Sequence, residues 1–388
     1  MVNFHFKVLF PGYVFFSCIL LASCTNEDYE YSLNLNEKWN IFRSSAINSS
    51  TFENKIKDYF LRIPFCEVTN RGTIIVGSDI RENSISDITH ISIGIVRSEN
   101  GGKSFKNPQI IIPHTNQSVY DRAMDATIIV NRNTGRIFVF AHHIATANDW
   151  LTTHTNGYYG YDCVYVYSDD DGLTWSPPQS IKKTLIGDLT DVITLFGGVG
   201  HGITMQDGTL VLPIQCKMAM NDNPNVYNIQ SGIVYSKDGG DSWSISKTLI
   251  PCYSSENMVV ESENGVLIAN CKSYIGERRV FMTKDLGENW ITHPSDRKLI
   301  EPIACQGSIH KKNNTYYFLN PYDTSRRKNI ILQESKDCIN WTPSLLLESR
   351  EVGGYSCLCH WNENLYAVIE MNGESIDFFC LNENNINL

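Results

Sequence analysis

Short motifs that contain arginine are the part of this sequence most suited to chemistry. Arg62 lies in Arg62-Ile63-Pro64, Arg81 closes Asp79-Ile80-Arg81, and Arg327 follows Arg326 in a polar stretch. A guanidinium group binds a carboxylate through two parallel hydrogen bonds, so clustered arginines suit an acidic ligand. The chain has a net charge of -10 and no basic block, which argues against a nucleic-acid partner. An anionic ligand would therefore depend on a local cluster of cations.

Asp87, Glu256 and Tyr355 could supply acid–base and nucleophilic chemistry. A carboxyl group can transfer protons, and a tyrosine hydroxyl becomes a nucleophile when a neighbouring base removes its proton. Each residue alone also has a structural explanation. Arg62 could pair with Glu370, Asp87 could lie in a turn, and Glu256 could be a solvated acid at a strand edge. Tyr355 is one of 19 tyrosines.

These residues occur together in the order and at the spacing found in sialidases, and residues 39–388 resemble that family. The resemblance implies that Arg62 and Arg327 bind the carboxylate of the substrate. Arg326 is the alternative match to the arginine that the family has near Arg327. It also implies that Arg81 lies beside the C4 substituent of the sugar. Glu370 matches the acid that supports the first arginine.

The same resemblance assigns the catalytic roles. Tyr355, in Gly354-Tyr355-Ser356, matches the nucleophile, Glu256 matches its base, and Asp87 matches the general acid and base. Sialic acid carries a carboxylate on its anomeric carbon, so a neutral tyrosine avoids the repulsion that a carboxylate nucleophile would meet. The reaction would proceed through a tyrosyl intermediate and retain the anomeric configuration. The resemblance implies no cofactor.

Lys272 departs from the family pattern, which has the second carboxylate-binding arginine at this position. Lysine keeps the positive charge but lacks the two parallel, coplanar N–H donors of a guanidinium group. Losing one charge-assisted hydrogen bond costs on the order of 1.5–3 kcal/mol. The chain could therefore be an exo-α-sialidase with a weakened clamp or a glycosidase for a related ulosonic acid, such as deaminated sialic acid or Kdo. It could also be a carbohydrate-binding propeller with impaired turnover.

Two further residues complete the expected site. Asp125 resembles an aspartate that faces the substrate in related enzymes, with a structural role as the alternative. Trp150 begins an aromatic stretch that would line the pocket beside the glycerol tail of the sugar. We expect both residues to bind substrate.

The elements that must position these residues are short β-strands. Apolar runs bounded by turn residues recur at 72–77, 135–140, 208–212 and 265–269, and no amphipathic helix interrupts them. The pattern Ser-x-Asp-x-Gly-x-x-Trp occurs at 168–175 and 236–243, with Thr for Ser at 283–290 and weaker copies at 98–105 and 335–341. Such repeats indicate a propeller. Together with the resemblance, they predict an all-β, six-bladed β-propeller of four-stranded antiparallel blades.

The N-terminal residues predict export and lipid anchoring. Residues 1–23 contain an apolar run too short to cross a bilayer comfortably. The run ends in Leu21-Ala22-Ser23-Cys24, which resembles the lipobox of bacterial lipoproteins and implies that Cys24 is lipidated and that 24–38 is a tether. An ordinary cleaved signal peptide is the alternative. Asn26-Glu27-Asp28 resembles a surface-targeting tract.

The expected location is therefore the outer membrane of a Gram-negative bacterium, exposed at the cell surface or otherwise in the periplasm. We expect a monomer that acts on sialylated glycans or glycoproteins. The chain has 12 cysteines, and those after Cys24 show neither a disulfide framework nor a Cys/His spacing typical of zinc. We expect them to be buried free thiols, with no metal bound.

Overall fold

The computed structural model describes residues 59–115, 121–144, 161–181, 185–186, 192–220, 223–302 and 304–382. In these residues the regular structure is β-sheet, apart from a 3-10 turn at Glu263–Gly265 and a single 3-10 residue, Ile181. No helix among them is long and apolar enough to cross a membrane. The predictions for residues 1–38 and for Trp150 lie outside the described residues.

Two antiparallel meanders form the N-terminal nine-stranded sheet. The first contains β1 (Tyr59–Val68), β2 (Ile74–Glu82), β3 (Ile91–Ser98) and β4 (Lys106–Ile112). The second contains β5 (Arg122–Val130), β6 (Ile137–Ile144), β7 (Tyr161–Ser168) and β8 (Gln179–Ser180). The meanders join where Ile91 pairs in parallel with Arg122, and β11 (Gly200–His201) adds to β5.

The remaining strands form four smaller sheets. One contains β9 (Leu185–Ile186), β10 (Val192–Gly197), β12 (Ile203–Thr204), β13 (Leu210–Met220), β14 (Asn223–Ser236) and β15 (Trp243–Ile245). The next contains β16 (Asn257–Glu261), β17 (Leu267–Cys271), β18 (Arg279–Thr283) and β19 (Ile291–Thr292). It is followed by β20 (Ser308–Lys312), β21 (Thr315–Pro321), β22 (Ile330–Ser335) and β23 (Thr342–Glu348). The last sheet contains β24 (Ser356–Trp361), β25 (Asn364–Met371) and β26 (Ser375–Asn382).

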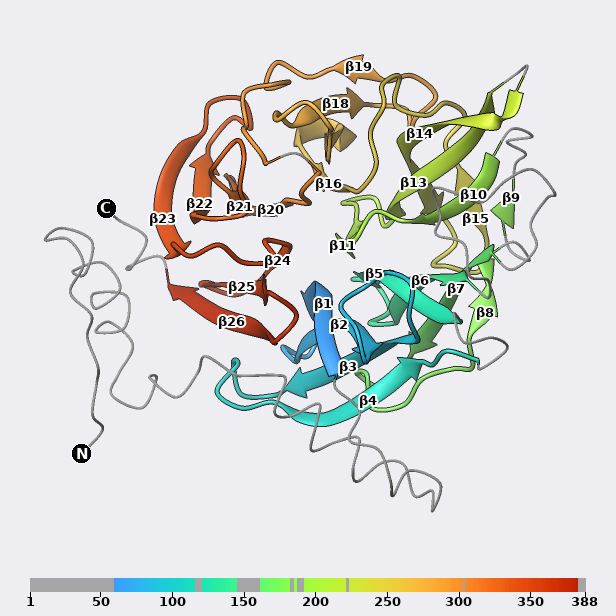
Figure 1. The fold of residues 1–388 in the computed structure, drawn as a ribbon, viewed down its shortest axis with the longest axis vertical. Helices are drawn as coiled ribbons and strands as arrows, with labels where there is room; N and C mark the ends of the chain where they lie inside the picture. The colour runs from blue at the N-terminus through green and yellow to red at the C-terminus, as the bar shows by residue number, and fades with distance from the viewer. Residues whose placement is uncertain are drawn as a thin grey trace, which may run out of the picture.

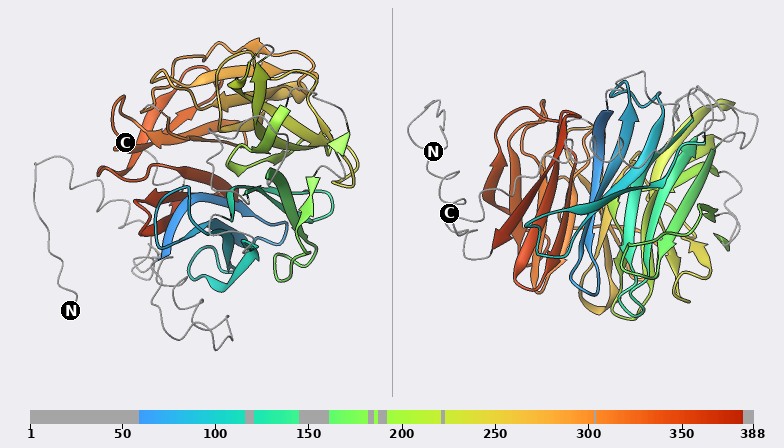
Figure 2. Two further views of the ribbon diagram at one scale, coloured as in Figure 1. Left: turned by 45° about the vertical axis from the view of Figure 1, so that its right-hand side comes forward. Right: turned by 90° about the horizontal axis from the view of Figure 1, so that it is seen from below.

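The sheets are arranged around a common axis, as in a propeller. Figure 1 shows β1, β5, β11, β16, β20 and β24 near the centre, with strands such as β4, β8, β19, β23 and β26 at the outer edge. The side view in Figure 2 shows the strands running from one face of the ring to the other. The ring closes where β1 packs against β24 and β25. This confirms the predicted all-β, propeller-like fold.

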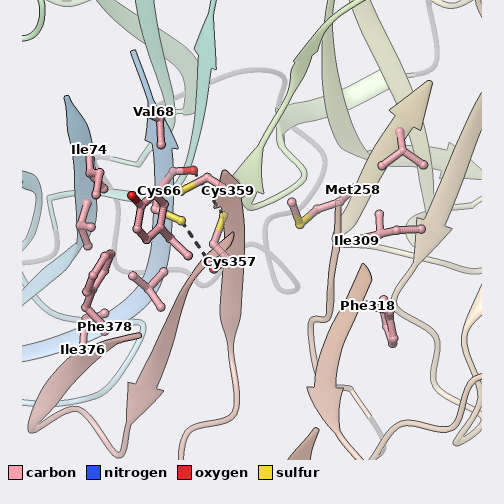
Figure 3. Close-up of a cluster of buried hydrophobic side chains, with 14 of the residues drawn as sticks. Cys66, Val68, Ile74, Met258, Ile309, Phe318, Cys357, Cys359, Ile376 and Phe378 are labelled. Carbon is pink, nitrogen blue, oxygen red and sulfur yellow. Dashed lines mark hydrogen bonds between the residues drawn. The ribbon is translucent and has the colours of Figure 1, made fainter. Parts of the chain in front are cut away.

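The hydrophobic core lies between neighbouring sheets, where strands of alternating or continuous apolar character face one another. Figure 3 shows Cys66 of β1 beside Cys357 of β24, with Val68 of β1 and Phe378 of β26 in the same cluster, all of them buried. The cysteines of the described residues are free thiols, and most are buried. They therefore act as small apolar side chains in the core, as the sequence predicted.

The repeated aspartate motifs form turns held by side-chain hydrogen bonds. In the copy at 236–243, the hydroxyl of Ser236 donates to Asp238 at 2.7 Å and accepts from the backbone N–H of Gly240 at 2.8 Å. In the third strong copy, hydrogen bonds from Asn289 and Thr283 lower the pKa of Asp285 to about 2. The weaker copies repeat the serine contact, with Ser98 on Asn100 and Ser335 on Asp337.

Candidate active site

The hydroxyl group of Tyr355 lies in a buried hydrogen-bonded trio. It donates to Glu256 Oε1 at 2.8 Å, while Lys272 Nζ donates to Glu256 Oε2 at 2.9 Å and to the tyrosine oxygen at 3.0 Å. Tyr355 precedes β24, Glu256 precedes β16 and Lys272 follows β17, where its backbone N–H donates to the Glu256 carbonyl at 2.7 Å. The exposed fractions are 4%, 7% and 8% for Tyr355, Glu256 and Lys272.

The charges around the trio act on the phenol in opposite directions. Burial raises the pKa of Tyr355, and Glu256 raises it further, whereas Lys272 and Arg327 lower it. Burial alone would lower the pKa of Lys272, but Glu256 and Tyr355 raise it well above its usual range. The phenol is therefore neutral at rest, with a carboxylate placed to accept its proton and an ammonium placed to stabilise the resulting anion.

Arg62 is fixed by an acid from the other end of the chain. Its Nε donates to Glu370 Oε1 at 2.8 Å, and the backbone N–H of Ile63 donates to Glu370 Oε2 at 3.1 Å. Ile63 has a φ of 55°, which a β-branched residue rarely adopts, and the register of β1 on β2 shifts between Arg62 and Phe65. The distorted strand and the buried carboxylate together set the direction of the arginine.

Arg327, rather than Arg326, lies toward Tyr355. Its guanidinium donates to the carbonyls of Gly353 and Ala304 at 3.0 and 2.9 Å. The Arg326 side chain is 66% exposed, with its nearest carboxylate, that of Glu351, 3.7 Å away. Of the two arginines that the sequence left open, this arrangement favours Arg327.

Three cations surround the ring of Tyr355. The guanidinium carbons of Arg62 and Arg327 lie 5.8 and 5.2 Å from the ring centroid, and Lys272 Nζ lies 5.6 Å from it. The structure thus brings together the three positions at which the sequence predicted a carboxylate clamp.

Gly353 and Gly354 make room for this arrangement, and sequence reasoning missed the first of them. A Cβ on Gly353 would lie 2.2 Å from Glu370 Oε1, so any larger residue would displace the acid that holds Arg62. Gly354 has a φ of 81° and passes close to Pro321 and Arg327. The pair of glycines before Tyr355 is the sequence signal that could have indicated this close approach.

Asp87 lies on the loop between β2 and β3 and is held by Arg81. Arg81 Nη1 donates to Asp87 Oδ1 at 2.6 Å, and Arg62 Nη1 lies 3.6 Å from the same oxygen. Partial burial would raise the pKa of Asp87, but the charges of Arg81 and Arg62 outweigh it and lower the pKa. The Asp87 side chain remains 56% exposed.

Arg81, which the resemblance places beside the sugar, makes its contacts in this structure with the protein itself. It is completely buried, and its Nη2 donates to Asp79 Oδ2 at 2.9 Å. The guanidinium is covered because the Asp87 loop folds back on it, with the Ile85 carbonyl accepting at 2.7 Å. In this structure its contacts are therefore with acids of the protein.

Asp125 joins the site through Asp79, a buried acid to which the sequence reasoning gave no role. The backbone N–H of Asp125 donates to Asp79 Oδ1 at 3.1 Å, and Asp125 has a φ of 58° where the register of β5 on β6 shifts. Burial raises the pKa of Asp79 to about 7, although Arg81 opposes the shift. Burial, with Asp79 and Glu256 nearby, raises the pKa of Asp125 well above its usual range.

The structure thus gathers most of the side chains that the sequence singled out. Tyr355 contacts Glu256 and Lys272, and Arg62 contacts Glu370. Asp87 contacts both Arg62 and Arg81, Asp125 donates its backbone N–H to Asp79, and Trp150 and Cys24 lie outside the described residues. The members of the gathered set are Arg62, Arg81, Asp87, Asp125, Glu256, Lys272, Arg327, Tyr355 and Glu370.

Comparisons with known proteins point to one family. A family profile described as a BNR repeat-like domain matches residues 65–329. A sialidase of Clostridium perfringens is 32% identical over 335 residues, covering 81% of this chain and 87% of that protein. A sialidase of Paraclostridium sordellii is 28% identical, covering 95% of this chain and 96% of that protein.

Solved structures agree in fold. A Hadza microbial sialidase is 31% identical with a TM-score of 0.77, and the match covers 84% of this chain and 66% of that one. The chain therefore spans slightly less than two thirds of that solved chain. Trypanosoma rangeli sialidase, at 21% identity and a TM-score of 0.72, shares the fold, and this chain spans 55% of it.

Proposed function

Because this chain belongs to the sialidase family of glycoside hydrolases, we propose that it is a retaining exo-α-sialidase that removes terminal sialic acids from glycoconjugates. The observation that carries the proposal is the hydrogen bond of 2.8 Å from the Tyr355 hydroxyl to Glu256, with three cations around the same ring. A phenol in this position is an activated nucleophile beside groups that attract a carboxylate.

The proposed reaction has two displacement steps. In the first, Glu256 accepts the phenolic proton while the Tyr355 oxygen bonds to the anomeric carbon, and Asp87 gives its proton to the leaving oxygen. In the second, Asp87 takes a proton from water, the hydroxide bonds to the anomeric carbon, and the Tyr355 oxygen leaves and regains its proton from Glu256. Two inversions give net retention.

The low pKa of Asp87 is compatible with its proposed role as an acid once substrate is bound. In the free protein Arg81 and Arg62 hold this pKa below its usual range. A substrate carboxylate paired with Arg62 would offset part of that positive charge, which raises the pKa of Asp87. We infer that substrate binding itself favours protonation of the acid.

Lys272 supports a second candidate, a glycosidase for a related ulosonic acid such as deaminated sialic acid or Kdo. The ammonium of Lys272 already donates to Glu256 and Tyr355. Arg62 and Arg327 are therefore the two groups that can bind a substrate carboxylate through paired N–H donors. Any sugar with a carboxylate on its anomeric carbon could use this clamp. A propeller that binds sugars without turnover is less consistent with the short contact between Tyr355 and Glu256.

The decisive test is release of the fluorophore from a fluorogenic sialoside by the wild type and by Tyr355→Phe. We expect the variant to lose turnover, because the phenylalanine ring has no nucleophilic oxygen. Tyr366→Phe is the matched control, since Tyr366 is a buried tyrosine that stacks on Phe378 in the core. Full activity in Tyr355→Phe would refute the proposal.

A substrate panel separates the two candidates. Fluorogenic glycosides of sialic acid, deaminated sialic acid and Kdo would be compared by kcat/KM, and nuclear magnetic resonance would identify the first-formed anomer. A preference for the sialoside with retention supports the sialidase. A preference for another ulosonic acid assigns the second candidate.

We also propose that the ring contains six blades. The nine-stranded sheet consists of two meanders, β1–β4 and β5–β8, that share only the pairing of Ile91 with Arg122. Counting these as separate blades and adding the four smaller sheets gives six. The pairing at Ile91 is then a contact between blades.

Finally, we propose that the chain is anchored in the outer membrane of a Gram-negative bacterium by acyl chains on Cys24 and faces the cell surface. The support is the sequence Leu21-Ala22-Ser23-Cys24 after a short apolar run, followed by Asn26-Glu27-Asp28. An anchor of this kind would hold the enzyme close to the glycans that it acts on, at the end of the tether 24–38.

A further inference from the structure

Glu82, His90 and His114 form a cluster of ligating side chains apart from the proposed catalytic residues. Glu82 ends β2, His90 immediately precedes β3, and His114 follows β4. The backbone N–H of Glu82 donates to the His90 carbonyl at 2.9 Å, and the N–H of His114 donates to Ser92 Oγ at 3.1 Å. The register of three adjacent strands therefore brings the three side chains into one row.

The ligating atoms are close and largely shielded from solvent. His114 Nε2 lies 3.5 Å from Glu82 Oε1, and His90 Nδ1 lies 3.9 Å from Glu82 Oε2. One ligand atom of each residue lies within 4.8 Å of the others, and the imidazole rings stack with centroids 4.5 Å apart. The side chains of Glu82, His114 and His90 are 8%, 14% and 24% exposed.

We propose that Glu82, His90 and His114 bind one divalent transition-metal ion, with Zn²⁺ as the preferred ion. Two imidazoles with one carboxylate suit zinc and its neighbours, whereas calcium and magnesium prefer sites made of oxygen ligands. Around a tetrahedral ion with bonds of about 2.0–2.1 Å, ligand atoms lie roughly 3.3 Å apart. Small side-chain rotations bring this cluster to that spacing, with water as the fourth ligand.

His114 has a further property that suits a ligand. Its Nδ1 is buried and has no hydrogen-bond partner among the described residues. No hydrogen bond to Nδ1 therefore commits the ring to one tautomer, and Nε2, which faces Glu82, can present its lone pair to a metal.

The metal would tie together the two ends of the loop that carries Asp87. This loop, residues 83–89, begins after Glu82 and ends before His90, and Thr89 Oγ1 already donates to the Glu82 carbonyl at 2.5 Å. Ligands from both ends and from His114 beyond β4 would add a cross-link at its base. The sequence expectation of no metal depended on short Cys/His spacings, whereas these ligands are brought together by strand pairing.

The test is a titration of the full chain, freed of metal by a chelator, with Co²⁺ followed by visible absorption and with Zn²⁺ followed by calorimetry. We expect one equivalent to bind, a spectrum typical of tetrahedral Co²⁺, and its loss on adding Zn²⁺. His90→Ala, His114→Ala and Glu82→Gln should each weaken binding at least about 10-fold, the effect that loss of even an outer partner has. Zn²⁺ should also raise the melting temperature of the wild type.

His143→Ala is the matched control. His143 is also a half-buried histidine beside a carboxylate, with Nε2 2.9 Å from Asp121 Oδ1, but it lies outside the cluster. This variant should bind the metal as the wild type does. If His114→Ala unfolds, which circular dichroism would detect, His114→Gln keeps the size of the side chain and removes the ligating nitrogen.

Two results would overturn the inference. One is a folded wild type that binds neither ion. The other is a folded His90→Ala or His114→Gln variant that binds Zn²⁺ as tightly as the wild type. Hydrogen exchange tests the loop tie: Zn²⁺ should protect residues 83–89 in the wild type but not in His114→Gln, and unchanged exchange in the wild type would refute the tie. None of these readouts depends on turnover of a sugar substrate.

Discussion

At the scale of single residues, the proposed reaction depends on a balance of charges around one phenol. Burial and Glu256 keep the Tyr355 hydroxyl neutral, and Lys272 and Arg327 reduce the cost of ionising it. The base and one of the cations touch the same oxygen, so proton removal and stabilisation of the anion occur at one atom. Lys272 therefore influences the nucleophile directly, in addition to any contact with the substrate.

Replacing Lys272 with Met tests this role. The change removes the ammonium that donates to the Tyr355 oxygen at 3.0 Å and keeps an unbranched side chain. We expect kcat to fall roughly 10- to 100-fold, the effect of losing a charge-assisted hydrogen bond worth about 1.5–3 kcal/mol. Steady-state kinetics with a fluorogenic sialoside would measure it. A rise in KM with kcat unchanged would show that Lys272 serves only substrate binding.

The control for Lys272→Met is Lys311→Met. Lys311 lies on β20, and its Nζ donates to the backbone carbonyl of Glu261 at 3.1 Å. Among the described residues Lys311 has no contact with Tyr355, Glu256 or Lys272. The kinetic constants of Lys311→Met should therefore match those of the wild type. Equal losses in the two variants would indicate a general effect on the fold.

Arg81→Gln tests the charge that acts on Asp87. Arg81 lowers the pKa of Asp87 by its charge and its hydrogen bond, so removing the charge should raise that pKa. Activity that requires protonated Asp87 falls at high pH, on the basic limb of the pH profile of kcat/KM. We expect this limb to move to higher pH in the variant. The pH profile of kcat/KM would measure the shift. Arg326→Gln, at an exposed position, should leave the profile unchanged.

Because Arg81 is fully buried against Asp79, the single variant leaves an unpaired acid. The double variant Asp79→Asn, Arg81→Gln removes both charges and keeps the pH test valid if the single variant does not fold. A limb that stays in place, or moves to lower pH, in a folded variant would contradict the role assigned to Arg81.

At the scale of elements, the site uses strands that depart from regular geometry. Ile63 on β1 and Asp125 on β5 both have positive φ, and each lies at a shift in strand register. Each also donates its backbone N–H to a buried carboxylate at 3.1 Å, Glu370 for Ile63 and Asp79 for Asp125. Uncommon backbone conformations of this kind persist when the surroundings fix them, and they cluster at functional sites.

Gly353→Ala tests the packing between the segment before β24 and the strand β25 that carries Glu370. The new Cβ would lie 2.2 Å from Glu370 Oε1, so the acid must move and Arg62 loses its fixed direction. We expect KM to rise at least about 10-fold through weaker binding of the carboxylate, the effect of one lost charge-assisted bond. Gly265→Ala, whose Cβ would meet nothing within 4 Å, should change stability but not KM.

The order of motifs along the chain predicted much of this site, because the family resemblance fixed Arg62, Glu256, Tyr355 and Glu370. The contact between Arg62 and Glu370 joins residues 308 positions apart, and it is present as expected. The full burial of Arg81 could not be predicted, since it depends on how the loop 83–89 folds back. The approach of Gly353 to Glu370 and the row formed by Glu82, His90 and His114 likewise arise from strand pairing, which a linear motif does not encode.

At the scale of the whole molecule, the site exists only when the ring is closed. Its residues come from segments that extend from β1, with Arg62, to β25, with Glu370, and β1 packs against β24 and β25. At that junction the Cys66 thiol donates to the Cys357 carbonyl at 3.5 Å, and the Cys357 thiol donates to the Cys66 carbonyl at 3.6 Å. Loss of closure should therefore separate Arg62 from Glu370 and remove activity before the individual sheets unfold.

The proposed anchor acts on the same scale, because it decides where the ring meets its substrates. Two or three acyl chains on one cysteine hold a protein stably in a membrane, since each buried CH₂ contributes about 0.8 kcal/mol, whereas one chain is marginal. In cells of a Gram-negative bacterium supplied with labelled palmitate, the wild type should carry the label and enter the detergent phase. Cys24→Ser should lose the label and enter the aqueous phase. Cys18→Ser, altered within the same apolar run, should behave as the wild type. Label retained in Cys24→Ser would mean that the anchor lies elsewhere, and an unlabelled wild type would leave the cleaved signal peptide as the explanation of the apolar run.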